Sequence, residues 1–179
     1  MKFLFTTLAI VCIIPLTTFA CGPSPQKVVR EVVIKADPAE VWAIVGDFGG
    51  MHKWHPAVID SAVERKHDAE GVESTYRTLM LNNGGKIVEK RRETQDGEMK
   101  LGVLMVQGNI AVSNYSDAIT VKSGQNVGES IVTWIGRFNN KTNAVQAPAG
   151  QDDVTAIAVV ERLYEAGLSN LKRVVVEKR

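Results

Sequence analysis

The feature that most constrains the fold is a long C-terminal segment, residues 152–177, with one apolar face. Gly167 interrupts this segment at a cost of about 1 kcal/mol relative to alanine in a helix, so we expect it to allow a close approach to a sheet. The large apolar residues recur at spacings of three and four, which predicts a helix with one buried face: Ile157, Val160, Tyr164, Leu168, Leu171 and Val175. Such a helix needs an apolar surface to cover.

The preceding residues predict that surface. Segments rich in β-branched residues alternate with turns containing Gly or Asn, at residues 28–36, 58–66, 72–81, 86–94, 99–107, 116–122 and 129–138. Residues 108–114 are expected to form an apolar connector. Strands grouped together with helices at the ends indicate an α+β fold with an antiparallel sheet. We therefore predict a curved antiparallel sheet of about seven strands wrapped around the long C-terminal helix.

A short helical insert is predicted after the first strand. Asp37 suits the N-cap position, Pro38 the first helical position, and Glu40 has the capping-box spacing. Gly49-Gly50 limits the helix on its C-terminal side. A compact aromatic turn follows at residues 54–56.

The N-terminus has the order of regions found in secretory signals. Lys2 precedes an apolar run at residues 3–14, and residues 18–20 end in a small residue before Cys21. The run is short for a membrane span, although an uncleaved anchor is an alternative. We predict a signal peptide at 1–20, a tether at 21–27 and one domain at 28–179. The protein is expected to be exported to the periplasm, either soluble or lipid-anchored through Cys21, because a lipobox-like cysteine and plain cleavage both fit.

Charge and cysteine content exclude several classes of function. Cleavage of residues 1–20 would remove one charged residue, Lys2. The 21 basic residues of the full chain would then become 20, against 20 acidic residues. That balance favours neither nucleic acid nor an anionic surface as a partner. Cys12 lies in the predicted signal, so no internal disulfide is expected in the exported protein.

Seven short motifs, in this order, resemble the helix-grip fold of the START/Bet v 1/polyketide-cyclase superfamily (SRPBCC). They lie at residues 36–42, 47–48, 54–56, 77–79, 87–89, 132–134 and 164–171, within a resemblance that covers nearly all of 28–172. The residues are most similar to exported MxaD-like proteins, described from methanol-oxidation gene clusters. This resemblance implies a cavity between the sheet and the long helix that takes hydrophobic ligands, but no single chemistry. Residues 108–112 depart from the Pro-rich segment expected there.

The charges that flank the turn at 82–85 are candidate ligand contacts. A two-residue loop at 83–84 would pair Thr78 with Glu89 and place Arg77 on the opposite face. A glycine bulge would pair Leu79 with Glu89 instead, with Arg77 diagonally across. Arg77, Leu79, Glu89 and Arg91 would then share the inner face. The Arg77–Glu89 pair is predicted to be either a self-satisfying buried ion pair or a polar anchor for a ligand.

Further side chains are expected in the core or cavity wall. Besides Arg77, Leu79, Glu89 and Arg91, the predicted ligand-binding set contains Trp54, His55, Met105, Trp134, Phe138, Tyr164 and Leu168. His55 is expected to cap the turn before Pro56 through a ring N–H or to line the cavity. No metal is expected, because His52, His55 and His67 lack a recognisable ligand set. No nucleotide-binding or nucleophile motif occurs, so no cofactor is expected.

Three functional hypotheses follow. The first is a non-catalytic exported protein that binds a small hydrophobic ligand. The second is a cyclase or dehydratase that uses Glu89, with His55 as the other candidate acid or base. The third, raised by the MxaD resemblance, is an accessory factor that binds a periplasmic dehydrogenase. The small number of candidate acid–base groups favours binding over catalysis.

Overall fold

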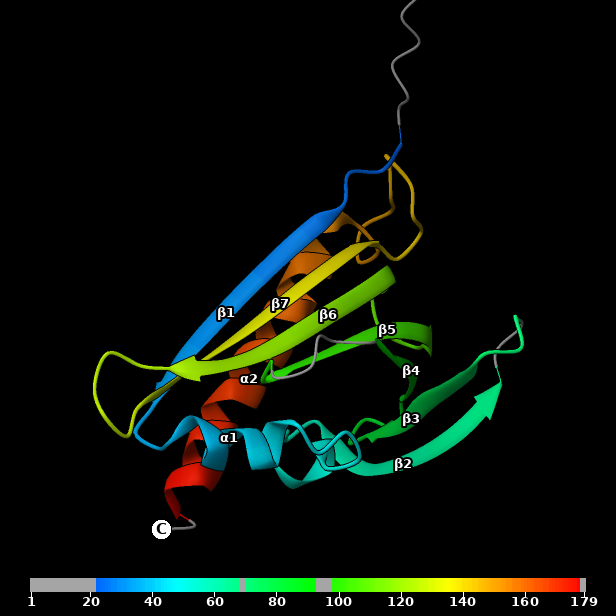
Figure 1. Cartoon of the computed structure of the whole chain (residues 1–179). Helices are drawn as coiled ribbons and strands as arrows, with labels where there is room; N and C mark the ends of the chain where they lie inside the picture. Colours follow the sequence, from blue (N-terminus) through cyan, green and yellow to red (C-terminus); the bar gives the residue numbers. More distant parts are fainter. Residues whose placement is uncertain (1–21, 68–69, 93–97, 178–179) are drawn as a thin grey trace, which may run out of the picture.

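The computed structural model describes residues 22–67, 70–92 and 98–177 (Figure 1). The predicted signal peptide at 1–20 and the predicted lipidation site Cys21 lie outside the described residues. The elements follow one another as β1 (Gln26–Ile34), α1 (Pro38–Val45), the 3₁₀ helix η1 (Met51–Lys53), β2 (Val58–His67), β3 (Glu73–Leu81), β4 (Lys86–Arg92), β5 (Lys100–Gly108), β6 (Val112–Ser123), β7 (Ser130–Asn140) and α2 (Asp153–Glu177). The first strand therefore begins within the segment expected to be a tether.

The strands form one antiparallel sheet in the order β1-β7-β6-β5-β4-β3-β2. Consecutive strands from β2 to β7 are neighbours, and β1 adds to the edge beside β7. The connection from β1 to β2 carries α1 and η1 from one edge of the sheet to the other (Figure 1). This arrangement confirms the predicted helix-grip α+β fold.

The core lies between the inner face of the sheet and α2. Residues of β7 alternate between buried and partly exposed, with Val132, Trp134 and Phe138 facing inward. They meet the apolar stripe of α2, in which Val160 and Tyr164 are fully buried or nearly so. The helix packs mainly against β1 and β7. Within the described ranges, neither helix combines the length and apolar character needed to cross a membrane.

Gly167 has the role that the sequence suggested. A Cβ atom there would lie 2.6 Å from Cδ2 of His55 and 2.9 Å from Cζ3 of Trp134. Both neighbours are rigid rings, so only a residue without a side chain lets α2 approach this closely. The cost of glycine in a helix is offset by the packing that it permits.

Two local predictions were wrong. The expected connector at 108–114 is shorter, because β6 already begins at Val112, which pairs with Asn140. A register shift between Ser113 and Ser116 absorbs Asn114, whose φ of 49° lies in the left-handed region. The carboxylate of Asp37 makes no capping hydrogen bond, although α1 begins at Pro38 as predicted.

Candidate functional site: the inner cavity

A cavity lies between the inner face of the sheet and α2, where the family resemblance places a ligand site. Its volume is about 40 Å³. Pockets that hold drug-sized ligands usually measure about 300–1,000 Å³, whereas a water molecule occupies about 30 Å³ of liquid. The cavity therefore has the predicted location but is nearly filled by side chains.

The wall of the cavity is mostly apolar and contains one group of polar side chains: His55, Glu89, Tyr115, Asp117, Trp134 and Tyr164. Among the lining residues, Met105, Ile110 and Leu163 are partly and not fully buried, so they mark a side of the cavity that is close to solvent. They come from β5, the β5–β6 connector and α2. Any enlargement of the cavity would begin with these side chains.

Asp117 is the centre of a buried hydrogen-bond cluster. Its Oδ2 atom accepts from the Tyr115 hydroxyl at 2.5 Å and from Nε1 of Trp134 at 3.0 Å. The hydroxyls of Tyr115 and Tyr164 are 2.7 Å apart. Gly136 makes room for the Tyr164 hydroxyl, because a Cβ atom there would collide with it. Residues from β6, β7 and α2 thus meet at one carboxyl group.

The surroundings of Asp117 raise its pKa to about 7. Burial is the main cause, and the nearby charge of Glu89 adds to it; hydrogen bonds from Tyr115 and Trp134 act in the opposite direction. Burial also raises the pKa of the Tyr115 hydroxyl well above its usual value. The cluster therefore holds a carboxyl group that can gain or lose a proton near neutral pH, beside a hydroxyl that stays neutral.

Arg77 and Glu89 form a buried ion pair on β3 and β4. Both residues are 5% exposed, and Nε of Arg77 lies 2.5 Å from Oε2 of Glu89. Nη1 of Arg77 donates to the Phe48 carbonyl at 3.1 Å, and its guanidinium lies 4.8 Å from the centre of the Phe48 ring. Arg77 is thus satisfied by the protein itself.

Neither predicted register of the β3–β4 hairpin is correct. Arg77 lies directly opposite Glu89, and Leu79 opposite Ile87. The loop has three residues, 82–84: the N–H of Leu81 donates to the Gly85 carbonyl, and Gly84 has a φ of 81°. This register differs by two residues from the predicted bulge register. Because side chains alternate with a period of two, the predicted inner face is still correct for Arg77, Leu79 and Glu89.

His55 bridges the aromatic turn and α2. Its Nδ1 accepts from the N–H of Ala57 at 3.2 Å, and its Nε2 lies 3.1 Å from the Leu163 carbonyl oxygen. An N–H can only donate and a carbonyl can only accept, so the ring carries its proton on Nε2. Burial lowers the pKa of His55 to about 4, so the ring is neutral near pH 7. The turn is capped through a ring acceptor, not through the predicted ring N–H.

The structure places the predicted ligand-binding residues in two groups. His55, Leu79, Glu89, Met105, Trp134 and Tyr164 line the cavity. Trp54, Arg77, Phe138 and Leu168 are buried outside the lining, while Arg91 is exposed, with its guanidinium 5.8 Å from the Phe48 ring centre. Arg91 lies beyond the part of β4 that is covered. Ligand binding by these residues stays a prediction.

Asp117 and Tyr115 were missed by the sequence analysis. The sequence did contain a signal for Asp117. Asp117, Ile119 and Val121 occupy every second position of β6, so the acidic residue shares one face of the strand with apolar ones. A carboxylate on that face had to be buried. Among the residues that the structure describes, no group of three or more His, Cys, Asp or Glu is placed to hold a metal ion.

Comparison with known families agrees with this geometry. Residues 25–176 match the family described as polyketide cyclase / dehydrase and lipid transport. The chain belongs to this family. None of the curated proteins is similar enough to count as a match.

Solved structures share the fold. XoxI from Bacillus cereus is 25% identical with a TM-score of 0.67, covering 84% of this chain and 95% of that chain. The Zhui aromatase/cyclase from Streptomyces sp. R1128 is 15% identical with a TM-score of 0.65, covering 87% and 96%. A START superfamily protein from Mycobacterium smegmatis is 15% identical with a TM-score of 0.58, covering 82% and 97%. At 15% identity these last two similarities concern the fold alone.

Proposed function

We propose that the protein binds a small molecule with an apolar body and one hydrogen-bonding group in the inner cavity, without transforming it. The observation that carries this proposal is the cluster of Asp117, Tyr115 and Tyr164 on an otherwise apolar cavity wall. Burying a carboxyl group costs free energy that apolar residues of similar size would avoid. The cluster offers both donors and acceptors to the polar end of a ligand.

Such a ligand requires the cavity to enlarge. Methionine side chains adapt readily, because they are unbranched and flexible. Met51 and Met105 both line the cavity, and Met105 packs so closely on Gly108 that a Cβ there would lie 2.6 Å from its sulfur. A change of rotamer at Met105, together with Ile110 and Leu163, would extend the cavity toward solvent.

An enzyme is the second candidate, favoured by the pKa of Asp117. A group that titrates near pH 7 is suited to general acid–base catalysis, as a cyclase or dehydratase would require. Asp117 is a better candidate than His55, because both ring nitrogens of His55 are already bound. Glu89 is less free, because it is paired with Arg77.

We further propose that the protein is exported, with a mature N-terminus at Cys21 that is either free or acylated. Support comes from the apolar run at 3–14 and the small residue before Cys21. Its sequence resembles MxaD-like proteins, so an accessory role for a periplasmic dehydrogenase is included in the proposal. Intact-mass measurement of the protein from an exporting host tests the site of cleavage, and retention of 1–20 would contradict it.

Native mass spectrometry of the purified full chain tests the binding proposal. We expect the parent to carry a small hydrophobic molecule, and Ala57→Leu to lose it, because Ala57 lines the cavity. Ala62→Leu is the matched control, since Ala62 is exposed on β2. Equal occupancy in both variants would place the ligand elsewhere. If the molecule that is released has lost one water relative to the molecule that was bound, the protein is a dehydratase instead.

A further inference from the structure

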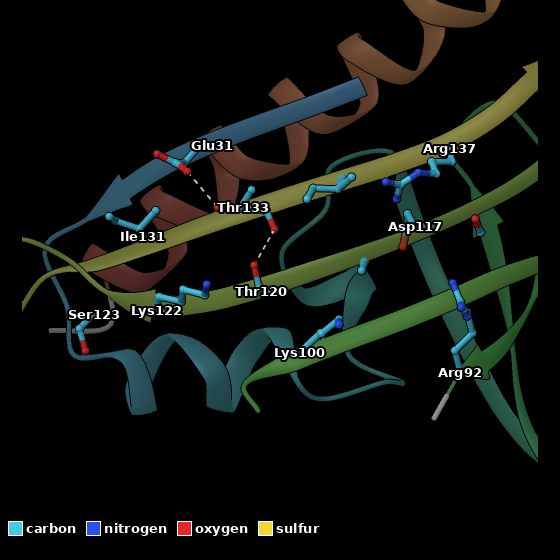
Figure 2. A pocket seen from close by; sticks show the side chains of 13 residues that line it. Glu31, Arg92, Lys100, Asp117, Thr120, Lys122, Ser123, Ile131, Thr133 and Arg137 are labelled. Carbon is cyan, nitrogen blue, oxygen red and sulfur yellow. Dashed lines mark hydrogen bonds between the residues drawn. The ribbon is translucent and has the colours of Figure 1, made fainter. Parts of the chain in front are cut away.

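A larger hollow, of about 580 Å³, lies on the outer face of the sheet, opposite α2 (Figure 2). Its floor is formed by outward-facing residues of β6 and β7, including Ser116, Ala118, Thr120 and Thr133. These residues alternate with the inward-facing ones that line the core, so the hollow and the inner cavity lie on opposite faces of the same strands.

Small residues create the hollow. Ala118 of β6 pairs directly with Gly102 of β5, so two neighbouring outward positions carry only a methyl group and a hydrogen. A Cβ at Gly102 would lie no closer than 3.5 Å to another heavy atom outside its immediate neighbours, which is ordinary contact. The nearest of these atoms is Cβ of Arg92, so the Arg92 side chain lies over Gly102, while Ala118 lines the hollow itself.

Four cationic side chains surround this floor: Arg92 of β4, Lys100 of β5, Lys122 of β6 and Arg137 of β7 (Figure 2). We call this hollow the basic groove. Two acidic residues belong to its lining: Glu31, which accepts a hydrogen bond from Thr133 at 2.9 Å, and the buried Asp117. Nζ of Lys100 lies 3.7 Å from Glu98.

Three of the four cations have no acidic partner among the residues that the structure describes. Within the described residues, neither Arg92 nor Lys122 nor Arg137 takes part in an ion pair. The basic groove therefore has a clear excess of positive charge, although basic and acidic residues nearly balance over the whole chain. This concentration of charge favours an anionic occupant.

The sheet register spaces three of these cations regularly. Lys100 pairs with Thr120, two residues from Lys122, and Arg92 pairs with Gly102, two residues from Lys100. From one cation to the next, the row thus crosses to the adjacent strand and moves two residues along it. With the usual dimensions of a sheet, successive Cα atoms are then about 8 Å apart. Alternate residues of an extended chain lie about 7 Å apart on one side, so acidic side chains at alternate positions would match this row.

We propose that the basic groove binds an extended acidic segment of a protein partner. The charge is complementary, the lining comes from neighbouring strands between β1 and β4, and the row of cations has the spacing of alternate residues in an extended chain. A small anion would meet only part of this row. The floor of the groove lies on the opposite face of the sheet from the inner cavity, and Asp117 borders both. The proposal does not depend on what the inner cavity binds.

Fluorescence anisotropy with a labelled peptide of six Glu-Thr repeats tests the proposal on the full chain. We expect saturable binding that added NaCl weakens, and no binding of a Gln-Thr repeat peptide. Lys100→Glu with Lys122→Glu should weaken binding about tenfold or more, because two ion pairs become repulsive. Lys172→Glu, at an exposed position on α2, is the matched control and should leave binding unchanged.

Ala118→Leu tests the shape of the groove without changing its charge, because Ala118 lines the hollow. It should weaken peptide binding while the thermal midpoint, measured by circular dichroism, stays at or above that of the parent. Equal loss of binding in the Lys172→Glu variant would refute the proposal, as would the absence of saturable binding at low salt. Binding of phosphatidylglycerol vesicles without binding of the acidic peptide would assign the groove to a membrane surface instead.

Discussion

Removal of Arg77 should destabilise the protein far more than removal of both Arg77 and Glu89. In the Arg77→Met variant the Glu89 carboxylate loses its cation while it stays 5% exposed on an apolar wall. Breaking a buried pair in this way typically costs about 3–5 kcal/mol. We expect a value in the upper part of this range, because Asp117 is a second carboxyl group close enough for the charge of Glu89 to raise its pKa.

The double variant, Arg77→Met with Glu89→Leu, leaves no unpaired charge. It still loses the hydrogen bond from Arg77 to the Phe48 carbonyl and the contact of the guanidinium with the Phe48 ring. These interactions are worth about 1–2 kcal/mol together. The double variant should therefore be more stable than Arg77→Met alone by about 2–3 kcal/mol.

Urea denaturation of the parent, both single variants and the double variant at two pH values measures these free energies. The charge of Arg77 lowers the pKa of Asp117, so its removal raises that pKa beyond about 7. Near pH 5 Asp117 is protonated in parent and variant, and the destabilisation by Arg77→Met should be smaller. Near pH 8 the two carboxyl groups oppose each other, and the destabilisation should be larger.

Two results would refute this reasoning. An Arg77→Met variant as stable as the parent would mean that both side chains face water. A double variant as unstable as Arg77→Met would mean that lost packing, not the unpaired Glu89 carboxylate, causes the effect.

Three further predictions concern single positions. Asp117→Asn should be more stable than the parent above about pH 7 by at most about 4 kcal/mol, because a folded-state pKa raised from 3.8 to about 7 means that stability is lost as pH rises through that interval. Gly167→Ala should lower stability by about 2 kcal/mol despite the better helix propensity of alanine, because its Cβ meets the rings of His55 and Trp134. Asp37→Ala should change the denaturation midpoint little, because the carboxylate makes no capping bond.

The comparison of Asp117→Asn with the parent must be made at each pH, because His55 acts in the opposite direction. Its pKa is lowered from 6.5 to about 4, so the folded state loses stability as pH falls through that range. The difference between variant and parent isolates Asp117. A difference that stays constant between pH 4 and 8 would show that Asp117 does not titrate there. For Gly167→Ala and Asp37→Ala, thermal midpoints measured by circular dichroism are sufficient, and a stabilised Gly167→Ala or a strongly destabilised Asp37→Ala would contradict the packing and the cap geometry.

The candidate site could be predicted only in part. The alternation along β3 and β4 identified the inner face that holds Arg77, Leu79 and Glu89, and this face was correct in the structure. The direct pairing of Arg77 with Glu89 was not predicted, because it depends on the length and the position of the loop: the observed three-residue loop at 82–84 pairs these residues, whereas a two-residue loop at 83–84 would pair Thr78 with Glu89. Sequences with Asn and Gly at several consecutive loop positions permit each of these lengths.

The sequence by itself determined the order of the elements, the apolar face of α2 and the two faces of each strand. These features follow from local periods of 3.6 residues in a helix and 2 residues in a strand. It also showed why Gly167 belongs in the helix. Only the tertiary structure decided that the inner cavity is nearly filled, that Tyr115 and Tyr164 meet at Asp117, and that four cations gather on the outer face. The physical reason is that volume, desolvation and charge density depend on side chains brought together from distant parts of the chain, and local periodicity carries no information about them.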